Sequence, residues 1–321
     1  MNRSGRPTVD LTLVIPVQDE EGNVDLLYER SLPVLERRGG GTWEIIFVDD
    51  GSTDRTFARL AEIHRRDRRV RVVRLRRNFG QTVALAAGFD HTRGRRVVTM
   101  DGDLQNDPRD IPSILAKMDE GFAVVSGWRR DRKEPFLSRR LPSIVANRLI
   151  SWLSGVGLHD YGCTLKGYER SVVDRLHIYA EMHRFLPAFA ALTGARTAEI
   201  EVRHHPRHSG RSKYGLSRVG KVIADLLALQ MLLHFSSKPR YWFNYIALPF
   251  GALGILIGAW AAYWYVREPF AGPEIVLPGT TFLLFFLWFY LVSLGWFAEL
   301  VSATGNYRQG RMISGAGGGT P

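Results

Sequence analysis

Short apolar runs alternate with amphipathic stretches through the first 130 residues of the chain. Five runs are rich in Val and Ile, are bounded by Gly, Asp or Pro, and have the length of β-strands: residues 9–17, 43–49, 70–75, 95–101 and 122–127. The segments between them have helical periodicity, at about 22–38, 53–66, 80–92 and 108–120. Strands that alternate with helices predict a largely parallel sheet with helices on both faces.

Two much longer apolar segments follow. Residues 241–266 are 26 consecutive positions without a charge, and residues 275–298 are another 24. Each exceeds the roughly 20 residues that a helix needs to cross the hydrocarbon core of a bilayer. Trp and Tyr gather toward their ends, as expected for rings that settle at the headgroup level. The pattern predicts two transmembrane helices rather than two buried helices of a soluble protein, in which such uncharged lengths are rare.

The charges that flank these segments predict their orientation. Lys238 and Arg240 precede the first segment, and Arg308 and Arg311 follow the second. The connecting residues 267–274 carry one positive and two negative charges. Because cytoplasmic loops carry the excess of Lys and Arg, both ends of the hairpin are expected in the cytoplasm.

These segments divide the chain into four expected parts. Residues 215–235 are apolar with basic residues only in their first turns, as in a helix at a membrane surface. No signal peptide is visible, because the first ten residues are polar and the next apolar run is short. We expect a cytoplasmic domain over 1–214, a juxtamembrane amphipathic helix over 215–240, a transmembrane hairpin over 241–303 and a flexible cytoplasmic tail over 304–321.

The composition adds a strong basic bias. The chain has 43 Lys and Arg against 32 Asp and Glu, yet residues 241–303 contain only four charged side chains. The positive excess therefore lies outside the hairpin, and phosphate groups or anionic lipid become expected partners. A nucleic-acid binder is an alternative, but the basic residues lack the aromatic interleaving of a single-strand groove. The single cysteine excludes a disulfide scaffold.

Acidic residues follow three of the predicted strands: Asp19, Glu20 and Glu21 after the first, Asp49 and Asp50 after the second, and Asp101 and Asp103 after the fourth. Ligands of open parallel sheets bind beyond the carboxyl ends of the strands, so these carboxylates are expected to meet and to hold a divalent cation. The chain has neither a Gly-x-Gly-x-x-Gly fingerprint after the first strand nor a P-loop.

Six motifs connect these acids to a known family: VIPVQDEEGNV (14–24), FVDDGSTDRT (47–56), RNFGQTVALAAGFDHTRG (77–94), MDGDLQNDP (100–108), DYGCTLKGYER (160–170) and RHSGRSKYG (207–215). Together they resemble glycosyltransferase family 2, and within it the polyprenyl-phosphate glycosyltransferases, a branch that includes dolichol-phosphate mannose synthase and the undecaprenyl-phosphate glucose and aminoarabinose transferases. The resemblance implies an α/β fold of GT-A type: a Rossmann-like, mostly parallel sheet with helices on both faces, then juxtamembrane helices and a C-terminal transmembrane hairpin.

The resemblance assigns a metal site to the turn after the fourth strand. Asp101-Gly-Asp103 followed by Gln105 matches the family's Asp-x-Asp element. It implies that Asp103 and Gln105 hold Mg²⁺ or Mn²⁺, with Asp101 toward the metal or the nucleoside. Carboxylate and amide oxygens suit such hard cations, and a nucleotide sugar brings two charged phosphates for the cation to bind. The alternative for an isolated Asp-Gly-Asp is a surface turn.

The resemblance also assigns residues that bind the nucleotide sugar, with a UDP-sugar favoured: Pro16, Val17, Asp19, Glu20, Asp50, Arg77, Asn78, Gly80, Gln81, Asp101 and Arg129. A glycine lets the backbone approach a ligand, and an arginine can meet a phosphate. Asp49, Ser52, Thr53 and Asp54 are better interpreted as caps of the following helix. Arg129 has the alternative of a lipid-facing surface charge.

On the acceptor side, Asp160 falls where the family carries an acidic residue. A lipid monophosphate, with a second pKa near ~6, is already mostly a dianion at neutral pH. We therefore assign Asp160 to orienting the acceptor or a sugar hydroxyl, with general-base catalysis as the lesser option. The other catalytic residues that the resemblance implies are Asp103 and a phosphate clamp of Arg203, Arg211 and Lys213. Its sugar or acceptor pocket is Tyr161, Lys166, Glu181, His183, Arg184, Ser212 and Tyr214.

Two features invite a chemical interpretation that we do not favour. Cys163 is interpreted as a small packed side chain, because no neighbouring His or helix start would activate it as a nucleophile. His204, His205 and His208 resemble a metal cluster, but no cysteine accompanies them. We expect these histidines to be solvated.

The resemblance implies an inverting, metal-dependent glycosyltransferase that moves one sugar from a nucleotide diphosphate sugar to a polyprenyl phosphate such as undecaprenyl phosphate. It implies a bacterial inner membrane protein with a cytoplasmic catalytic domain, a role in cell-envelope glycan or lipid modification, contact with membrane lipids, no nucleic acid, and a homo-oligomer, dimer or tetramer. One alternative is a processive polysaccharide synthase, although the chain lacks a Gln-x-x-Arg-Trp element and has only two spans. The other is an inactive membrane scaffold of the same fold.

Overall fold

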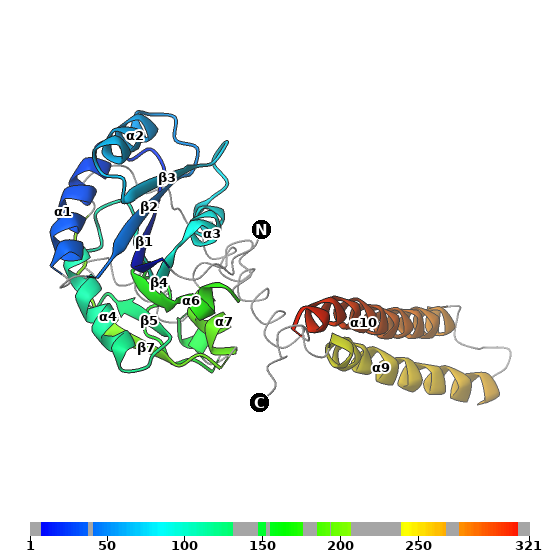
Figure 1. Ribbon diagram of the computed structural model, residues 1–321. Helices are drawn as coiled ribbons and strands as arrows, with labels where there is room; N and C mark the ends of the chain where they lie inside the picture. The colour runs from blue at the N-terminus through cyan, green and yellow to red at the C-terminus, as the bar shows by residue number, and fades with distance from the viewer. Residues whose placement is uncertain are drawn as a thin grey trace. The chain divides into compact units, whose positions relative to one another are not determined.

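A seven-stranded sheet lies at the centre of the N-terminal part of the chain (Figure 1). The computed structural model describes residues 8–37, 41–130, 147–151, 155–175, 185–192, 194–206, 239–267 and 276–313. The chain divides into two units, residues 1–226 with the sheet and residues 227–321 with two long helices.

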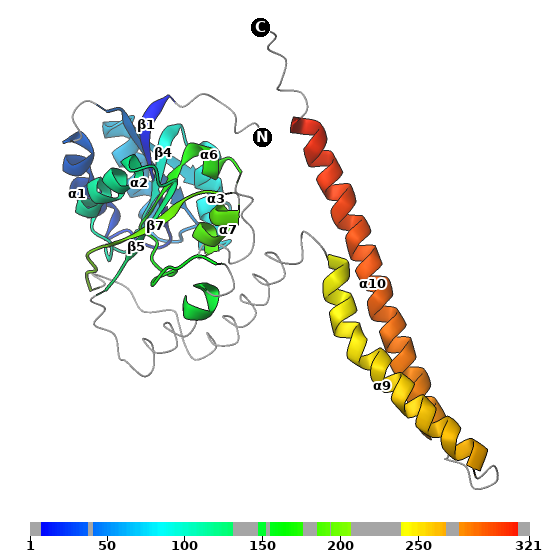
Figure 2. The same cartoon turned by 90° about the horizontal axis from the view of Figure 1, so that it is seen from below.

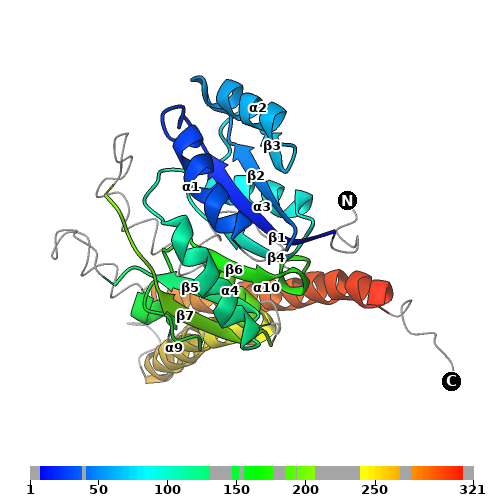
Figure 3. The same cartoon turned by 60° about the vertical axis from the view of Figure 1, so that its left-hand side comes forward.

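The strand order is β3-β2-β1-β4-β6-β5-β7, which Figure 3 displays from one end of the sheet to the other. The strands are β1 (Val9–Val17), β2 (Trp43–Asp49), β3 (Val70–Arg74), β4 (Gly94–Thr99), β5 (Val124–Trp128), β6 (Lys166–Glu169) and β7 (Thr197–Glu201). All neighbouring pairs are parallel except that β6 runs antiparallel to β4 and β5. The ends of β1, β2, β4, β5 and β7 and the start of β6 therefore meet at one edge.

Helices cover both faces of the sheet (Figure 2). They are α1 (Val24–Glu36), α2 (Thr56–Arg66), α3 (Gln81–His91), the 3-10 helix η1 (Pro108–Asp110), α4 (Ile111–Asp119), α6 (Arg170–Val173) and α7 (Leu186–Leu192). Apolar residues of α1, α2 and α4 pack into the core on one face, and those of α3, α6 and α7 pack on the other. Each strand of the central group is thus buried on both sides, which explains the nearly continuous apolar runs in the sequence.

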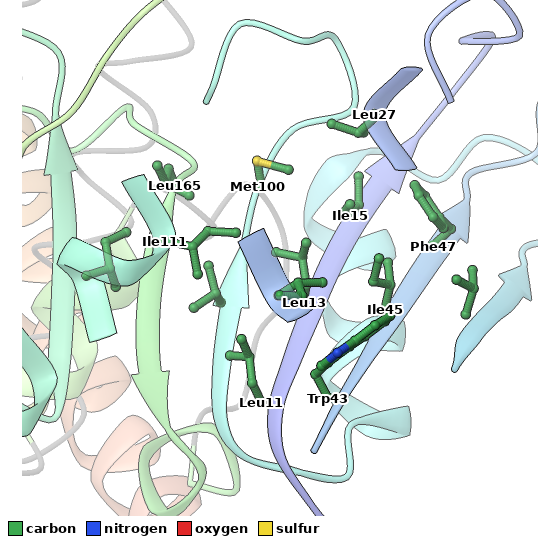
Figure 4. Close-up of a cluster of buried hydrophobic side chains, with 14 of the residues drawn as sticks. Leu11, Leu13, Ile15, Leu27, Trp43, Ile45, Phe47, Met100, Ile111 and Leu165 are labelled. Carbon is green, nitrogen blue, oxygen red and sulfur yellow. The ribbon is translucent and has the colours of Figure 1, made fainter. Parts of the chain in front are cut away.

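The alternation of side chains along β1 shows how these cores form. Leu11, Leu13 and Ile15 point into the core beneath α1, together with Phe47 of β2 (Figure 4), while Val14 belongs to the core on the α3 face. All of these side chains are fully buried. Burial of one such side chain contributes about 1.5–3 kcal/mol, so the two cores fix the positions of the strand ends that bear the acidic residues.

The prediction of a mostly parallel α/β sheet with helices on both faces is confirmed, and the predicted strands and helices match the observed ones to within a few residues. The short strands β6 and β7 are additions that the hydrophobic pattern does not predict. Strand β6 has only four residues, Lys-Gly-Tyr-Glu, and β7 is Thr-Ala-Glu-Ile-Glu. Both are too short and too polar to stand out from a loop.

The second unit consists of α9 (Pro239–Arg267) and α10 (Val276–Ile313). Small residues lie where the helices approach: a Cβ on Gly251 would lie 2.8 Å from Cδ1 of Trp288, and one on Gly295 would lie 2.9 Å from Cβ of Phe243. At the start of α9, the Arg240 N–H donates to Oε2 of Glu299 at 3.2 Å. Glu299 thus satisfies a backbone donor that the helix itself leaves unpaired.

Both helices are long and apolar enough to cross a membrane. Only 22% and 6% of their most apolar 18-residue stretches are buried, whereas a core helix of a soluble protein would be mostly buried. Helix α10 continues to Ile313, past the predicted end of the hairpin at residue 303 and into the predicted tail, because no proline interrupts this stretch. The predicted juxtamembrane helix, residues 215–240, lies almost entirely outside the described residues.

Candidate active site

The loops after β1 and β2 bind one another at the common edge of the sheet. The Asp19 N–H donates to Oγ of Ser52 at 3.0 Å, and the Thr53 N–H donates to Oδ1 of Asp19 at 2.8 Å. The Glu20 N–H donates to Oγ1 of Thr56 at 2.8 Å, at the start of α2. Asp19 has φ of 54°, a left-handed conformation that non-glycine residues adopt at a cost. These bonds make the predicted nucleotide-binding residues Asp19 and Glu20 part of one rigid double loop.

The helix-capping interpretation is wrong for Asp49, Ser52 and Thr53, which lie ahead of α2; only Asp54 accepts a backbone N–H of that helix. Oδ1 of Asp54 accepts the Thr56 N–H at 2.9 Å, at the start of α2, and Oδ1 of Asp49 accepts the Ser52 N–H at 3.0 Å. Burial of Asp54 favours its neutral form, but the donors of Thr56 and Glu21 outweigh it and hold the pKa of Asp54 below its ordinary value.

Asp50 organises the loop after β3. Its carboxylate accepts the N–H groups of Phe79 at 2.8 Å and Gly80 at 2.9 Å. Gly80 has φ of 94°. A Cβ on Gly51 would lie 2.3 Å from the carbonyl carbon of Arg77, so the two loops touch through their backbones. The predicted residues Asp50, Arg77, Asn78 and Gly80 therefore lie together, with Arg77 and Asn78 exposed.

The turn after β4 carries the predicted metal ligands and packs beneath the end of β1. A Cβ on Gly102 would lie 2.6 Å from Cγ1 of Val17 and 3.2 Å from the carbonyl oxygen of Pro16. Only glycine fits there, and Pro16 and Val17 form the support of the turn. Leu104, in the same turn, is buried with φ of 62°. Backbone in this region is uncommon outside glycine and often occurs at functional sites.

Asp101 and Asp103 lie close enough to repel one another. Burial, followed by the negative charge of Asp103, raises the pKa of Asp101 to about 6. Nε2 of Gln81 donates to Oδ1 of Asp101 at 2.6 Å, and Oδ1 of Asp103 accepts the Gln105 N–H at 3.2 Å. The turn therefore gathers Gln81, Asp101, Asp103 and Gln105, which the sequence assigns to the donor and the metal.

The donors of this turn are of the type that a hard divalent cation prefers. The described residues contain no group of three or more His, Cys, Asp and Glu that could hold a metal by itself. The turn contains two carboxylates, those of Asp101 and Asp103, and the amide of Gln105. Mg²⁺ and Mn²⁺ are commonly bound by one or two carboxylates together with substrate phosphates. A cation would also relieve the repulsion between Asp101 and Asp103, so the residues present fit such an ion.

Arg129 and Asp160 form a buried two-pronged ion pair. Nε of Arg129 donates to Oδ2 of Asp160 at 2.8 Å, and Nη2 donates to Oδ1 at 3.1 Å. The Gly162 N–H also donates to Oδ1, at 3.1 Å. Burial works against the charge on Arg129, but the Asp160 carboxylate outweighs it and keeps the pKa of Arg129 above its ordinary value. Arg129, predicted to bind the nucleotide sugar, and Asp160, predicted to orient the acceptor substrate, thus form one ion-paired unit.

A small pocket lies between Asp101, at the start of the metal turn, and residues 161–166. Its lining includes Gln81, Asp101, Tyr161, Thr164 and Lys166. Nζ of Lys166 donates to the carbonyl of Tyr161 at 2.9 Å, and the Tyr161 hydroxyl donates to the carbonyl of Val156 at 2.6 Å. Tyr161 and Lys166, predicted for the sugar or acceptor, therefore form part of its wall, Tyr161 from the loop before β6 and Lys166 from the first residue of β6.

Cys163 also lines the pocket but is fully buried. Burial raises the pKa of its thiol to about 11. The thiol is thus kept in its protonated, weakly nucleophilic form at neutral pH, as expected for a packed side chain.

Residues 203–205, which follow β7, lie along the metal turn as a strap. Asn106 and His204 form an antiparallel bridge, and the His205 N–H donates to the carbonyl of Gln105 at 2.9 Å. Nε2 of His205 lies 3.0 Å from Oδ2 of Asp107. The expectation that these histidines are solvated is wrong for His204, whose Nδ1 is buried against the turn, whereas the side chain of His205 is 42% exposed. His208 lies outside the described residues.

Arg203 begins the strap. Its N–H donates to Oδ2 of Asp110 at 2.7 Å, and its guanidinium lies 3.9 Å from Asp107 and 3.8 Å from Asp110. The other predicted residues of this region lie outside the described residues: Glu181, His183, Arg184, Arg211, Ser212, Lys213 and Tyr214.

Two acidic residues at this edge of the sheet, Asp107 and Glu199, are not among the site residues predicted from the sequence. Asp107 follows the metal turn and joins it to the strap, and Glu199 of β7 accepts the backbone N–H groups of His159 and Asp160. Asp107 lies inside the motif at 100–108, which is a signal that could have revealed it. Glu199 belongs to no motif, and nothing in the sequence distinguishes it from Glu201.

Comparisons with known proteins agree with this geometry. The model of the family described as Glycosyl transferase family 2 matches residues 12–176. The chain is 39% identical over 303 residues to a dodecaprenyl-phosphate galacturonate synthase of Rhizobium johnstonii, covering 92% of this chain and 89% of the relative. It is 34% identical over 300 residues to an undecaprenyl-phosphate 4-deoxy-4-formamido-L-arabinose transferase of Shewanella sediminis, covering 91% of this chain and 86% of the relative.

A solved structure has the same fold. It is glucosyl-3-phosphoglycerate synthase from Mycobacterium tuberculosis in complex with Mn²⁺, uridine diphosphate and phosphoglyceric acid. The two chains are 20% identical and superpose with a TM-score of 0.54, over 70% of this chain and 78% of the other.

Proposed function

The chain belongs to glycosyltransferase family 2, and we propose that it transfers a single sugar, with inversion, from a nucleotide diphosphate sugar to a polyprenyl phosphate. It is a glycosyltransferase with a GT-A-like mixed sheet. The observation that carries the proposal is the turn Asp101–Gln105, supported by Pro16 and Val17 and bordered by the ion pair of Arg129 and Asp160.

The donor binds across the ends of β1, β2 and β4 in this proposal. The double loop of Asp19 and Glu20 and the loop held by Asp50 take the nucleoside, and their mutual hydrogen bonds keep them in place before the donor arrives. A preorganised site of this kind reduces the ordering cost of binding. Arg77 and Asn78 are exposed at the end of that loop and are available to a phosphate.

Asp101, Asp103 and Gln105 would hold Mg²⁺ or Mn²⁺. When bound, the cation supplies positive charge to the departing diphosphate. The Mycobacterium tuberculosis structure holds Mn²⁺ with uridine diphosphate, which supports a divalent cation and a UDP-sugar.

Asp160 and Arg129 orient the reactants. Asp160 accepts two N–H groups from the Arg129 guanidinium, the Arg129 backbone N–H and the Gly162 N–H, so both of its oxygens are occupied by donors. A carboxylate engaged in this way is suited to holding a group in place rather than to removing a proton. Because the acceptor phosphate is already an anion, one in-line displacement at the anomeric carbon needs no base. In this proposal Arg203, Arg211 and Lys213 attract the phosphates.

The acceptor is a lipid phosphate. Both relatives named above carry a polyprenyl phosphate in their names. Two helices that can cross a membrane are consistent with an acceptor that stays in the bilayer. We place the protein in the bacterial inner membrane, with the catalytic domain in the cytoplasm, where the positive charge outside the hairpin faces anionic lipid. Assembly as a dimer or tetramer is part of the same proposal.

The names of the two relatives specify different sugars, galacturonate and 4-deoxy-4-formamido-L-arabinose. An experiment is therefore needed to identify the sugar that this protein transfers. Membranes containing the protein are incubated with a panel of radiolabelled nucleotide sugars and undecaprenyl phosphate, and lipid is extracted with organic solvent. The proposal predicts that one donor labels the lipid phase and that a chelator prevents the labelling. Label in a polymer would favour a processive synthase, and no label with any donor would favour an inactive scaffold.

A further inference from the structure

The carboxylate of Glu199 is nearly buried, and both of its oxygens have hydrogen-bond partners. Its side chain is 10% exposed. Both oxygens lie 3.0 Å from the N–H of His159, one of them also accepts the N–H of Asp160 at 3.0 Å, and Oε2 lies 2.8 Å from Nδ1 of His159. Burying a carboxylate is costly unless such donors surround it. Its donors all come from the two residues that lead into the ion pair with Arg129.

The sheet explains why Glu199 reaches this loop. Strand β7 is parallel to β5, with Glu199 opposite Ser126 and Glu201 opposite Trp128, so the ends of both strands face the same edge. Arg129 follows directly after β5. The loop before β6 brings His159 onto the ring of Trp128, with 4.4 Å between ring centroids, and Asp160 onto Arg129.

We infer that Glu199 is a positioning residue of the transfer reaction, which holds the backbone of His159 and Asp160 so that the Asp160 carboxylate meets Arg129. The inference rests on the proposed function, in which Asp160 and Arg129 orient the reactants. Oε1 accepts the N–H groups of both His159 and Asp160, and Oε2 faces the His159 N–H and Nδ1. Glutamine would remove the negative charge that attracts these N–H groups and would turn an NH2 group toward the His159 N–H. Glu199 itself does not touch the reacting atoms.

The structure supplies a matched control two residues along the same strand. Glu201 pairs with Arg130 at 2.7 Å, and both of these side chains are mostly exposed, at 55% and 63%. An exposed pair of this kind contributes little. Glu199→Gln and Glu201→Gln therefore make the same chemical change on one strand, and only the first affects the loop that carries Asp160.

The test measures initial transfer rates of full-length protein in membranes for the wild type, Glu199→Gln, Glu201→Gln, Asp160→Asn and the double variant Glu199→Gln/Asp160→Asn. We expect Glu199→Gln to lower kcat/KM about 10- to 100-fold, by analogy with the loss found when the residues that orient metal ligands are removed. Glu201→Gln is expected to stay within about twofold of the wild type. The double variant should be no slower than Asp160→Asn alone, because Glu199 acts through Asp160.

Multiplicative losses in the double variant would overturn the inference, since they would show that Glu199 acts independently of Asp160. Equal rates for Glu199→Gln and the wild type would also overturn it. His159→Ala, which keeps both backbone donors and removes the imidazole, should retain most of the activity; a loss as large as that of Glu199→Gln would assign the effect to the imidazole instead.

Thermal unfolding in detergent distinguishes a folding defect from a positioning effect, because the inference expects Glu199→Gln to remain folded at the assay temperature. If Glu199→Gln does not fold, Glu199→Asp replaces it in the comparison of single and double variants. This variant keeps both carboxylate oxygens on a shorter side chain. Failure of the proposed function is recognised separately, because the wild type and Glu201→Gln would then transfer no sugar at all.

Discussion

Asp101 and Asp160 are carboxylates at the same edge of the sheet, but their neighbours differ. Asp101 lies beside Asp103, and burial together with that negative charge raises its pKa to about 6. Asp160 lies against the guanidinium of Arg129, with both oxygens occupied by N–H donors. A site that concentrates negative charge attracts a cation, whereas a neutralised ion pair provides a fixed point for orientation. The two carboxylates are thus suited to different roles in one reaction.

At Asp160, the expected result of substitution follows from this ion pair. Asp160→Asn should slow transfer roughly 10- to 100-fold, because the amide leaves the buried Arg129 without a counter-charge and disturbs its orientation. The pH of maximal rate should not move upward, since no proton is removed from the acceptor. Rates of the wild type and the variant between about pH 5.5 and 9 check this. Loss of the acidic limb of the profile in the variant would instead identify Asp160 as a general base.

Cys163 gives a prediction that does not depend on activity. With a pKa of about 11, roughly a thousandth of the thiol is ionised at pH 8, and the side chain is fully buried. Folded protein should therefore react very slowly with iodoacetamide at pH 8, faster as the pH rises, and completely after unfolding in urea. Cys163→Ser should retain transfer activity. Rapid labelling of the folded protein at pH 7 would contradict a packed, protonated thiol.

At the scale of elements, the sequence predicts what is long and regular. Strand β1 is a continuous apolar run that ends at Val17, and its bounds agree with the prediction. Strand β7 is a five-residue, largely polar sequence, so the hydrophobic pattern could not predict it. The position of Glu199 on this strand could therefore not be predicted either. The motifs place Arg129 and Asp160 near a ligand, but their ion pair joins residues 31 apart in the chain and depends on β6 lying antiparallel beside β5. Such contacts are properties of tertiary packing rather than of spacing.

The strap formed by residues 203–205 is expected to depend on Asp107. Asp107→Ala removes the partner of His205 and Arg109, so amides of the strap should exchange with solvent at least tenfold faster, the effect of losing about 1.5 kcal/mol of charge-assisted hydrogen bonding. Hydrogen exchange of a peptide that covers residues 202–206 measures this. Arg109→Ala is the control, because it leaves the bond between Asp107 and His205 in place. Unchanged exchange in Asp107→Ala would mean that backbone pairing alone holds the strap.

The hairpin is expected to depend on close packing at Gly251. Gly251→Leu would place a side chain where even a Cβ lies 2.8 Å from Trp288, and overpacking of this kind costs about 1–3 kcal/mol. The variant should unfold at lower temperature in detergent than the wild type. Gly279→Leu is the matched control, because a Cβ at Gly279 meets nothing within 4 Å. Equal stability of the two variants would show that α9 and α10 do not pack through Gly251.

At the scale of the molecule, charge and apolar surface are separated along the chain. Residues 241–303 contain only four charged side chains, and the helices α9 and α10 leave most of their apolar surface exposed. The first unit carries the acidic turn, the ion pair and the pocket. A chain built in this way suits a water-soluble donor and a lipid-bound acceptor. The sequence predicted this division from composition alone, whereas the family resemblance was needed to recognise the chemistry of the site.

The measurement that tests the central claim most directly is sugar transfer to undecaprenyl phosphate by membranes containing the wild type or Asp103→Asn, with the active donor, as Mn²⁺ is titrated. We expect transfer by the wild type to require the cation, and Asp103→Asn to be slower by roughly 100- to 1000-fold at every concentration. Asp25→Asn, which affects only an exposed pair with Arg59 at the start of α1, serves as the control and should match the wild type. Normal transfer by Asp103→Asn, or full activity of the wild type in excess chelator, would contradict the account.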